Sequence, residues 1–192
     1  MAVGFPKRQD PTFSSIREAI RDKTLGEVEQ VIIWSRDVNP QPKEYMKVSG
    51  TMIVDSAIHE FDLARALLGP DDYPVSIYTV GSTLVLPEAC AEANDVTRTN
   101  ITMKTKLGRL VCFQSKFRFG PSAVACHHCS ITDDLFRCLS LDARRAVAGH
   151  DQRVEVHCER GDLKAVRASF QGLVTTRSVL TTQPSAGEPP RP

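Results

Sequence analysis

The stretch that decides the fold is Val48-Ser-Gly-Thr-Met-Ile-Val-Asp-Ser-Ala-Ile-His-Glu-Phe-Asp-Leu-Ala-Arg-Ala-Leu-Leu-Gly69. It begins with the small-residue turn Ser49-Gly50, and Gly69 with Pro70 directly after it is a typical helix stop signal. Apolar residues recur between these limits at the spacing of a helix and cover most of its circumference. They are Ile58, Phe61, Leu63, Ala64, Leu67 and Leu68. The pattern predicts a helix that is buried on nearly all sides.

A narrow polar stripe remains on this helix, formed by Asp55, His59 and Asp62. Residues at i, i+4 and i+7 lie on one helix face. Buried carboxylate and imidazole groups are costly unless they pair or face a wet cavity. The stripe is therefore the place where we expect chemistry. Two other interpretations stay open: a core histidine hydrogen-bonded to Asp55 or Asp62, and metal chelation, for which no third ligand lies nearby in the sequence.

The rest of the chain predicts one helix and several strands. Asp10-Pro11 is a helix start signal, and Lys23 and Gly26 are expected to close that helix. Strands are expected at 27–37, 74–86, 95–106, 110–115, 152–158 and 163–169, with hairpins at Gly108 and Gly161 and a loop at 87–94. This order predicts an α+β fold with an open, mostly antiparallel sheet and helices on one face.

Composition limits the class of protein. The 192 residues are 41% apolar, which suffices for a core, and the net charge of +1 argues against a general nucleic-acid-binding role. No apolar run reaches the roughly 18 residues that cross a bilayer, and the N-terminus has no signal-peptide pattern. We expect a cytoplasmic protein with reduced cysteines, no membrane and no nucleic-acid partner.

The cluster Cys126-His-His-Cys129 resembles half of a zinc site. A structural zinc needs four ligands, and a single C-x-x-C is weak evidence beside an accidental cluster. A zinc-binding interaction module through Cys126 and Cys129 is therefore the third functional hypothesis, and no metal ligand is assigned. The sequence has no Gly-x-Gly, so it carries no dinucleotide fingerprint.

Four segments resemble the Gfo/Idh/MocA oxidoreductases, most closely the inositol 2-dehydrogenase subgroup. Residues 3–13 are similar to their "GFNRRFDPxF" segment, and Leu25 to Asp37 resembles the first strand of their second domain. Residues 50–62 resemble their "GGxxxDxxxHxxD" helix, and residues 149–156 resemble their "YGYDQRxEV" strand, with His150 at the position of a tyrosine. The similarity covers residues 3–115 and 144–168.

The resemblance implies a dihydrodipicolinate-reductase-like C-terminal domain that follows a Rossmann domain holding NAD or NADP. It implies oxidation of a CH–OH group of a polyol or sugar, and a homo-oligomer assembled through the open sheet. His59 would accept the hydroxyl proton, because a neutral imidazole near pH 7 suits that task. Asp55 is the second implied catalytic residue and would orient the imidazole or hold substrate. Ser56, Asp37 and His150 would contact substrate, and Lys7 would lie near the nicotinamide of the cofactor.

The expected domain organisation has three parts. Residues 1–24 would be the remnant of the end of a Rossmann domain, residues 25–170 the substrate and oligomerisation domain with an atypical insertion at 116–143, and residues 171–192 a disordered, proline-rich tail. Because the glycine fingerprint is missing, we expect this chain to be inactive alone. The main alternative is a non-catalytic truncated homologue that acts only as a folding or oligomerisation module.

Overall fold

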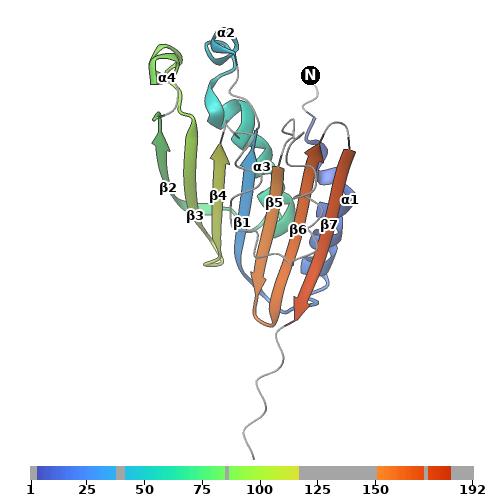
Figure 1. The fold of residues 1–192 in the computed structure, drawn as a ribbon. Coiled ribbons are helices and arrows are strands. Elements are labelled where there is room, and N and C mark those ends of the chain that lie inside the picture. The colour runs from blue at the N-terminus through green and yellow to red at the C-terminus, as the bar shows by residue number, and fades with distance from the viewer. Residues whose placement is uncertain (1–3, 38–41, 85–86, 117–150, 171–172, 183–192) are drawn as a thin grey trace, which may run out of the picture.

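The computed structural model of the chain describes residues 4–37, 42–84, 87–116, 151–170 and 173–182. One seven-stranded sheet dominates these residues, in the order β2-β3-β4-β1-β5-β6-β7 (Figure 1). The strands are β1 (Val28–Arg36), β2 (Pro74–Ser82), β3 (Arg98–Thr105), β4 (Leu110–Lys116), β5 (Asp151–Cys158), β6 (Gly161–Phe170) and β7 (Leu173–Thr182). All neighbouring described strands are antiparallel except β1 and β4, so the predicted α+β fold with a mostly antiparallel sheet is confirmed.

The two long helices, α1 (Pro11–Arg21) and α3 (Ile58–Leu68), pack on the same face of the sheet (Figure 1). Strand residues alternate accordingly: Val31 and Ile33 of β1 are buried, whereas their neighbours are partly exposed. The core joins side chains from both helices to those of β1, β3, β4, β5 and β6. Burial of this apolar surface against the helices is what holds the layers together.

The predicted start of the first helix and the predicted end of the second are confirmed. Asp10 caps α1 by accepting a hydrogen bond from the backbone N–H of Thr12 at 2.9 Å, and Pro11 is the first helical residue. At the other end of α3, Gly69 has φ +89°, a conformation that favours glycine. Local signals therefore suffice to place these ends.

The stretch before α3 departs from a regular helix. Residues Ile53–Ala57 form a π-helical turn, an irregularity that is common at functional sites. Asp95, from the segment before β3, anchors the beginning of this stretch, because its Oδ1 accepts the backbone N–H of Met52 at 2.9 Å and of Val96 at 2.7 Å. A carboxylate from elsewhere in the chain thus replaces the local helix cap that the sequence lacks at this point.

Thr51, at the start of the π-helical stretch, has φ +79°, directly after Gly50 at φ +88°. A β-branched residue in this region is strained by about 1–3 kcal/mol. We expect Thr51→Gly to raise the free energy of unfolding by about 1 kcal/mol, after the greater freedom of the unfolded glycine is deducted. Urea denaturation checks this. Asn94→Gly is the matched control, because asparagine tolerates its φ of +50° and should gain only a few tenths of a kcal/mol. A loss of stability in Thr51→Gly would refute the strain.

Two expectations about secondary structure were wrong, and one short helix was not predicted. Residues Pro87–Ala93 form helix α4 rather than a loop, which is understandable because proline at the first position and three alanines favour a helix. A short helix α2 (Lys43–Met46) was not predicted; it packs on α4 through Met46, Ala89 and Cys90. Residues Leu173–Thr182, expected within the disordered tail, form β7, paired along its length with β6. The backbone pairing of β6 supplies the order that this polar stretch cannot supply alone.

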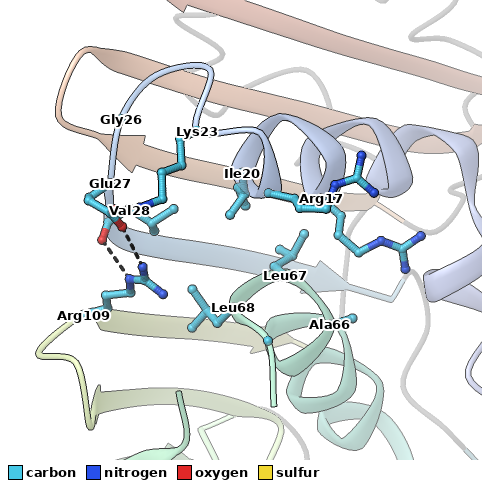
Figure 2. Close-up of a pocket in the computed structure, with 12 residues that line it drawn as sticks. Arg17, Ile20, Lys23, Gly26, Glu27, Val28, Ala66, Leu67, Leu68 and Arg109 are labelled. Carbon is cyan, nitrogen blue, oxygen red and sulfur yellow. Dashed lines mark hydrogen bonds and ion pairs between the residues drawn. The ribbon is translucent and has the colours of Figure 1, made fainter. Parts of the chain in front are cut away.

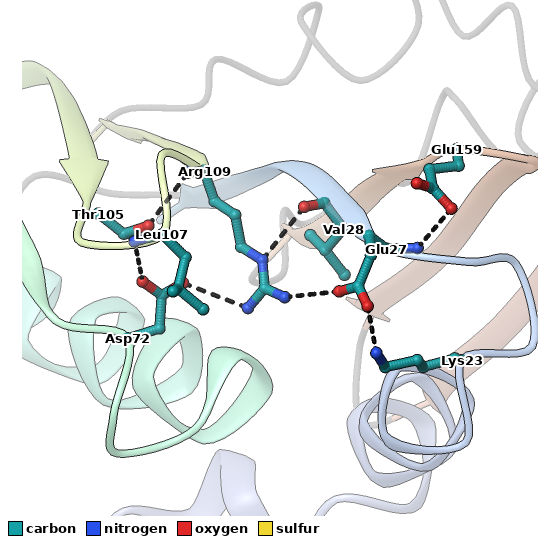
Figure 3. A network of polar contacts seen from close by, with 8 residues as sticks. All are labelled: Lys23, Glu27, Val28, Asp72, Thr105, Leu107, Arg109 and Glu159. Atoms are coloured by element: carbon teal, nitrogen blue, oxygen red, sulfur yellow. Dashed lines mark hydrogen bonds and ion pairs between the residues drawn. The ribbon is translucent and has the colours of Figure 1, made fainter.

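The polar contacts of Arg109 join three turns at one end of the sheet (Figure 3). Its guanidinium donates to Asp72 after α3 at 3.2 Å, to Glu27 before β1 at 3.0 Å, and to the carbonyl of Val28 at 3.2 Å. Asp72 also accepts the N–H of Leu107 in the β3–β4 turn at 3.0 Å. Arg109 therefore ties the end of the helix layer to the sheet.

The opposite face of the sheet has no helix on it in the described part of the chain (Figure 1). Trp34 lies on this face and donates from Nε1 to Oε1 of Gln114 at 3.1 Å. At the edge of the sheet, every residue of β2 except Ser82 is exposed, including Ile77, Tyr78 and Val80. Uncovered apolar strand surface of this kind is typical of an association surface.

Candidate functional site

His59 lies in the first turn of α3 and is half-buried. Its Nδ1 atom is buried and has no hydrogen-bond partner among the described residues. The aromatic ring of Phe5 packs edge-on against the imidazole, with ring centroids 5.9 Å apart and planes at 78°. An imidazole with one nitrogen buried and part of its ring open to solvent can accept a proton from a bound ligand.

Asp55 lies in the π-helical turn and does not pair with His59 in any hydrogen bond that the described residues make. Its Oδ1 instead accepts a hydrogen bond from the phenol of Tyr45 in α2 at 2.7 Å. Ser56 is beside it in the same turn and is also half-buried. Among the described residues, Asp55 is therefore hydrogen-bonded to a tyrosine that the sequence interpretation did not consider.

The hydrogen bond to Asp55 raises the pKa of Tyr45, with smaller contributions from burial and from the carboxylate charge. The neutral phenol donates to the carboxylate, whereas a phenolate would lose that bond and face a like charge. We therefore expect Tyr45 to ionise at higher pH in the wild-type chain than in Asp55→Asn, as measured by absorbance near 295 nm. Tyr45→Phe identifies the contribution of this residue. Equal titration curves for wild type and Asp55→Asn would contradict the contact.

Asp62 is buried and binds Arg8 in a bidentate ion pair, with Nη2–Oδ1 at 2.5 Å and Nε–Oδ2 at 2.7 Å. Asp62 and His59 share α3, whereas Asp55 belongs to the π-helical turn before it. Each member has its own partner: Tyr45 for Asp55, Phe5 for His59 and Arg8 for Asp62. Neither carboxylate is bonded to His59 Nδ1, so the core-histidine interpretation gains no support from these contacts.

Lys7 lies in the 3-10 turn η1 (Pro6–Gln9), and its ammonium pairs with Oε1 of Glu60 at 2.5 Å. Both side chains are almost fully buried, with 10% of Lys7 and 1% of Glu60 exposed. Glu60 and Arg8 were missed at the sequence level. Two features of the sequence could have indicated them. Residues 7 and 8 are both cationic, and acidic residues on an otherwise apolar helix need cationic partners when they are buried.

The remaining predicted site residues are placed only in part. Asp37 directly follows the last residue of β1, Arg36, and is half-buried. His150, Cys126 and Cys129 lie outside the described residues, as does most of the predicted insertion at 116–143. Within the described ranges, no group of three or more histidine, cysteine or acidic residues could hold a metal ion. No helix in those ranges is long and apolar enough to span a membrane.

A groove lies away from His59, between the C-terminal ends of α1 and α3 (Figure 2). Its floor is apolar, formed by Ile20, Leu67 and Leu68, and its rim carries Arg17, Arg21, Lys23 and Arg109. Helix C-termini carry partial negative charge, and cations there are stabilising in themselves. Lys23 and Arg109 also pair with Glu27. The helix C-termini and Glu27 therefore explain the cations of this groove without a ligand.

Comparison with known proteins identifies relatives of the chain. A family model described as the GFO/IDH/MocA C-terminal domain matches residues 13–132. An inositol 2-dehydrogenase of Rhizobium meliloti is 34% identical over 165 residues, which are 86% of this chain and 41% of that protein. The chain thus spans about two fifths of the length of this relative.

Solved structures agree with the sequence comparison. A myo-inositol dehydrogenase from Corynebacterium glutamicum superimposes with a TM-score of 0.65 at 26% identity, covering 89% of this chain and 44% of that one. A scyllo-inositol dehydrogenase from Lactobacillus casei, whose structure holds NAD(H) and scyllo-inositol, has a TM-score of 0.61 at 13% identity, over 85% of this chain and 41% of that one. The second likeness shows a shared fold only.

Proposed function

Because this chain belongs to the Gfo/Idh/MocA oxidoreductase family through its C-terminal domain, we propose that it forms the substrate-binding part of an NAD- or NADP-dependent inositol dehydrogenase. The observation that carries the proposal is His59, which has a partly open ring and a buried Nδ1 with no hydrogen-bond partner in the part of the chain that the structure describes. The relatives' names supply the substrate class, a cyclic polyol, and the reaction class, oxidation of a CH–OH group.

His59 has the chemistry of the proton acceptor in this proposal. Since Nδ1 is buried, Nε2 is the nitrogen left to receive a proton from the carbinol hydroxyl. Asp55 and Ser56, half-buried in the adjoining π-helical turn, would accept and donate hydrogen bonds to further hydroxyls, with Tyr45 orienting Asp55. Asp37 and His150 remain proposed substrate contacts.

The described residues do not by themselves fit a dinucleotide. Lys7, which the family resemblance places near the nicotinamide, has its charge taken up by Glu60 at 2.5 Å, and both groups are buried. A buried ammonium that is already paired with a carboxylate is not free to bind a further polar group of a cofactor. In this proposal the hydride acceptor is held chiefly by other parts of a complete dehydrogenase, and the chain alone is inactive.

The uncovered sheet face supports a homo-oligomer as a second part of the proposal. Its strands present Ile32, Trp34 and Cys112 beside charged side chains, with no described helix over them. A chain that acts only through this face, without catalysis, is the alternative function. The two functions differ in whether substitution of His59 has any consequence beyond stability.

A chimera tests the enzymatic proposal. This chain would replace the matching segment of the Rhizobium meliloti relative, and oxidation of myo- and scyllo-inositol would be followed as NADH formation at 340 nm. We expect activity in the chimera and a loss of at least roughly 10²-fold in kcat for His59→Ala, as for removal of a general base. His157→Ala is the control, since His157 pairs with Asp162 on the β5–β6 hairpin and should leave activity unchanged. A folded chimera with no activity, or with activity that survives His59→Ala, would refute the proposal.

A further inference from the structure

Two ion pairs fix the segment Pro6–Gln9 against α3. Lys7 pairs with Glu60, and the next residue, Arg8, pairs with Asp62 in two parallel hydrogen bonds. A bidentate arginine–carboxylate pair constrains geometry as well as contributing energy. Together the two pairs set the register between this segment and the first turns of the helix.

Burial of the Glu60 carboxylate at its position costs free energy. Only 1% of its side chain is exposed, and its Oε2 has no hydrogen-bond partner among the described residues. An apolar residue would fill this place at lower cost, because desolvation of a buried pair often exceeds the attraction within it. Stability alone therefore does not explain the carboxylate, and a gain in positional precision is the physical alternative.

The residue whose position would be made precise is His59. His59 precedes Glu60 on α3, and Phe5 stands two residues before Lys7. The Phe5 ring meets the imidazole edge-on at 5.9 Å, which is a directional contact. Because Lys7 is held to Glu60, the backbone of its segment cannot slide along α3, and the Phe5 ring stays in place.

We infer that Glu60 is a positioning residue for His59: by binding Lys7 it docks the Phe5–Lys7 segment so that the Phe5 ring fixes the plane of the imidazole. Asp62 supports the same docking through Arg8. The catalytic meaning of this positioning rests on the proposed function, in which His59 accepts the substrate proton.

Nuclear magnetic resonance of the full 192-residue chain tests the inference without any activity. The Hδ2 and Hε1 resonances of His59, assigned by their absence in His59→Gln, report the ring current of Phe5, and Phe5→Leu gives their positions without it. We expect Glu60→Gln to shift both resonances toward the Phe5→Leu positions. Lys7→Arg, which keeps the ion pair, should leave them near the wild-type positions, and so should the control Glu92→Gln in an exposed pair with Lys47.

The double variant Lys7→Met/Glu60→Leu decides the matter if Glu60→Gln does not fold, because it leaves no buried charge unpaired. A folded double variant with wild-type His59 resonances would overturn the inference and leave the pair a purely structural element. In the chimera, displacement of the imidazole should lower kcat by up to roughly 10²-fold, with a smaller change in KM. Shifted resonances in a chimera that oxidises no polyol would refute the proposed function and leave the positioning contact standing.

Discussion

Arg109→Met will lower the free energy of unfolding by about 3 kcal/mol, as measured by urea denaturation. The guanidinium is mostly buried, with 16% of its side chain exposed, and the carboxylate of Asp72 that it binds is 2% exposed. Removing the cation leaves Asp72 buried, and among the described residues the N–H of Leu107 is its remaining hydrogen-bond donor. Burial of an uncompensated charge is among the most costly effects of a single substitution.

Loss of the guanidinium also removes contacts to the turn before β1. Arg109 binds Glu27 and the carbonyl of Val28, so the substitution releases that turn from the end of α3 (Figure 3). Arg21→Met is the matched control, because its partner Asp22 is exposed and such pairs contribute less than about 1 kcal/mol. If Arg109→Met were no more damaging than Arg21→Met, Arg109 would not be the junction that we describe.

Lys7→Met will lower the free energy of unfolding by about 3–5 kcal/mol, because it leaves the Glu60 carboxylate buried and unpaired. The double variant Lys7→Met/Glu60→Leu should recover most of this loss, since it removes both desolvated charges and fills their volume with apolar groups. Denaturation of the four members of this double-mutant cycle measures the interaction.

The control for this cycle is Lys47→Met, which removes an exposed cation that pairs with Glu92 at 3.2 Å. Its cost should stay below about 1 kcal/mol. A double variant as unstable as Lys7→Met would show that the loss comes from packing of the lysine stem rather than from the unpaired carboxylate. The changes in unfolding free energy of Lys7→Met, the double variant and Lys47→Met together separate the contribution of charge from that of side-chain volume.

The difference between sequence and structure is clearest around His59. Helical spacing predicted a buried helix with Asp55, His59 and Asp62 on one face, and the helix with its end at Gly69 is confirmed. The π-helical turn Ile53–Ala57, in which Asp55 lies, could not be predicted. Nothing in local spacing distinguishes a residue in such a turn from one in a regular helix.

Partners across long sequence separations were equally out of reach. Glu60 lies 53 residues from Lys7, and Asp62 lies 54 residues from Arg8. A charge on an apolar helix shows that a partner is needed, but which cation supplies it depends on how η1 meets α3. The same holds for Asp55. The motif resemblance associates it with His59, whereas in the fold its carboxylate accepts a hydrogen bond from Tyr45.

The sequence by itself determined what local chemistry controls: the helix caps at Asp10 and Gly69, the hairpin turns at Gly108 and Gly161, and strand alternation that yields a mostly antiparallel sheet. Only the tertiary structure decided the pairing of β7 with β6, the helix at Pro87–Ala93 as a partner of α2, and the ion pairs that surround His59. The physical reason is range. Caps, turns and periodicity act over a few residues, whereas a buried charge takes its partner from whichever segment the packed layers bring within about 3 Å.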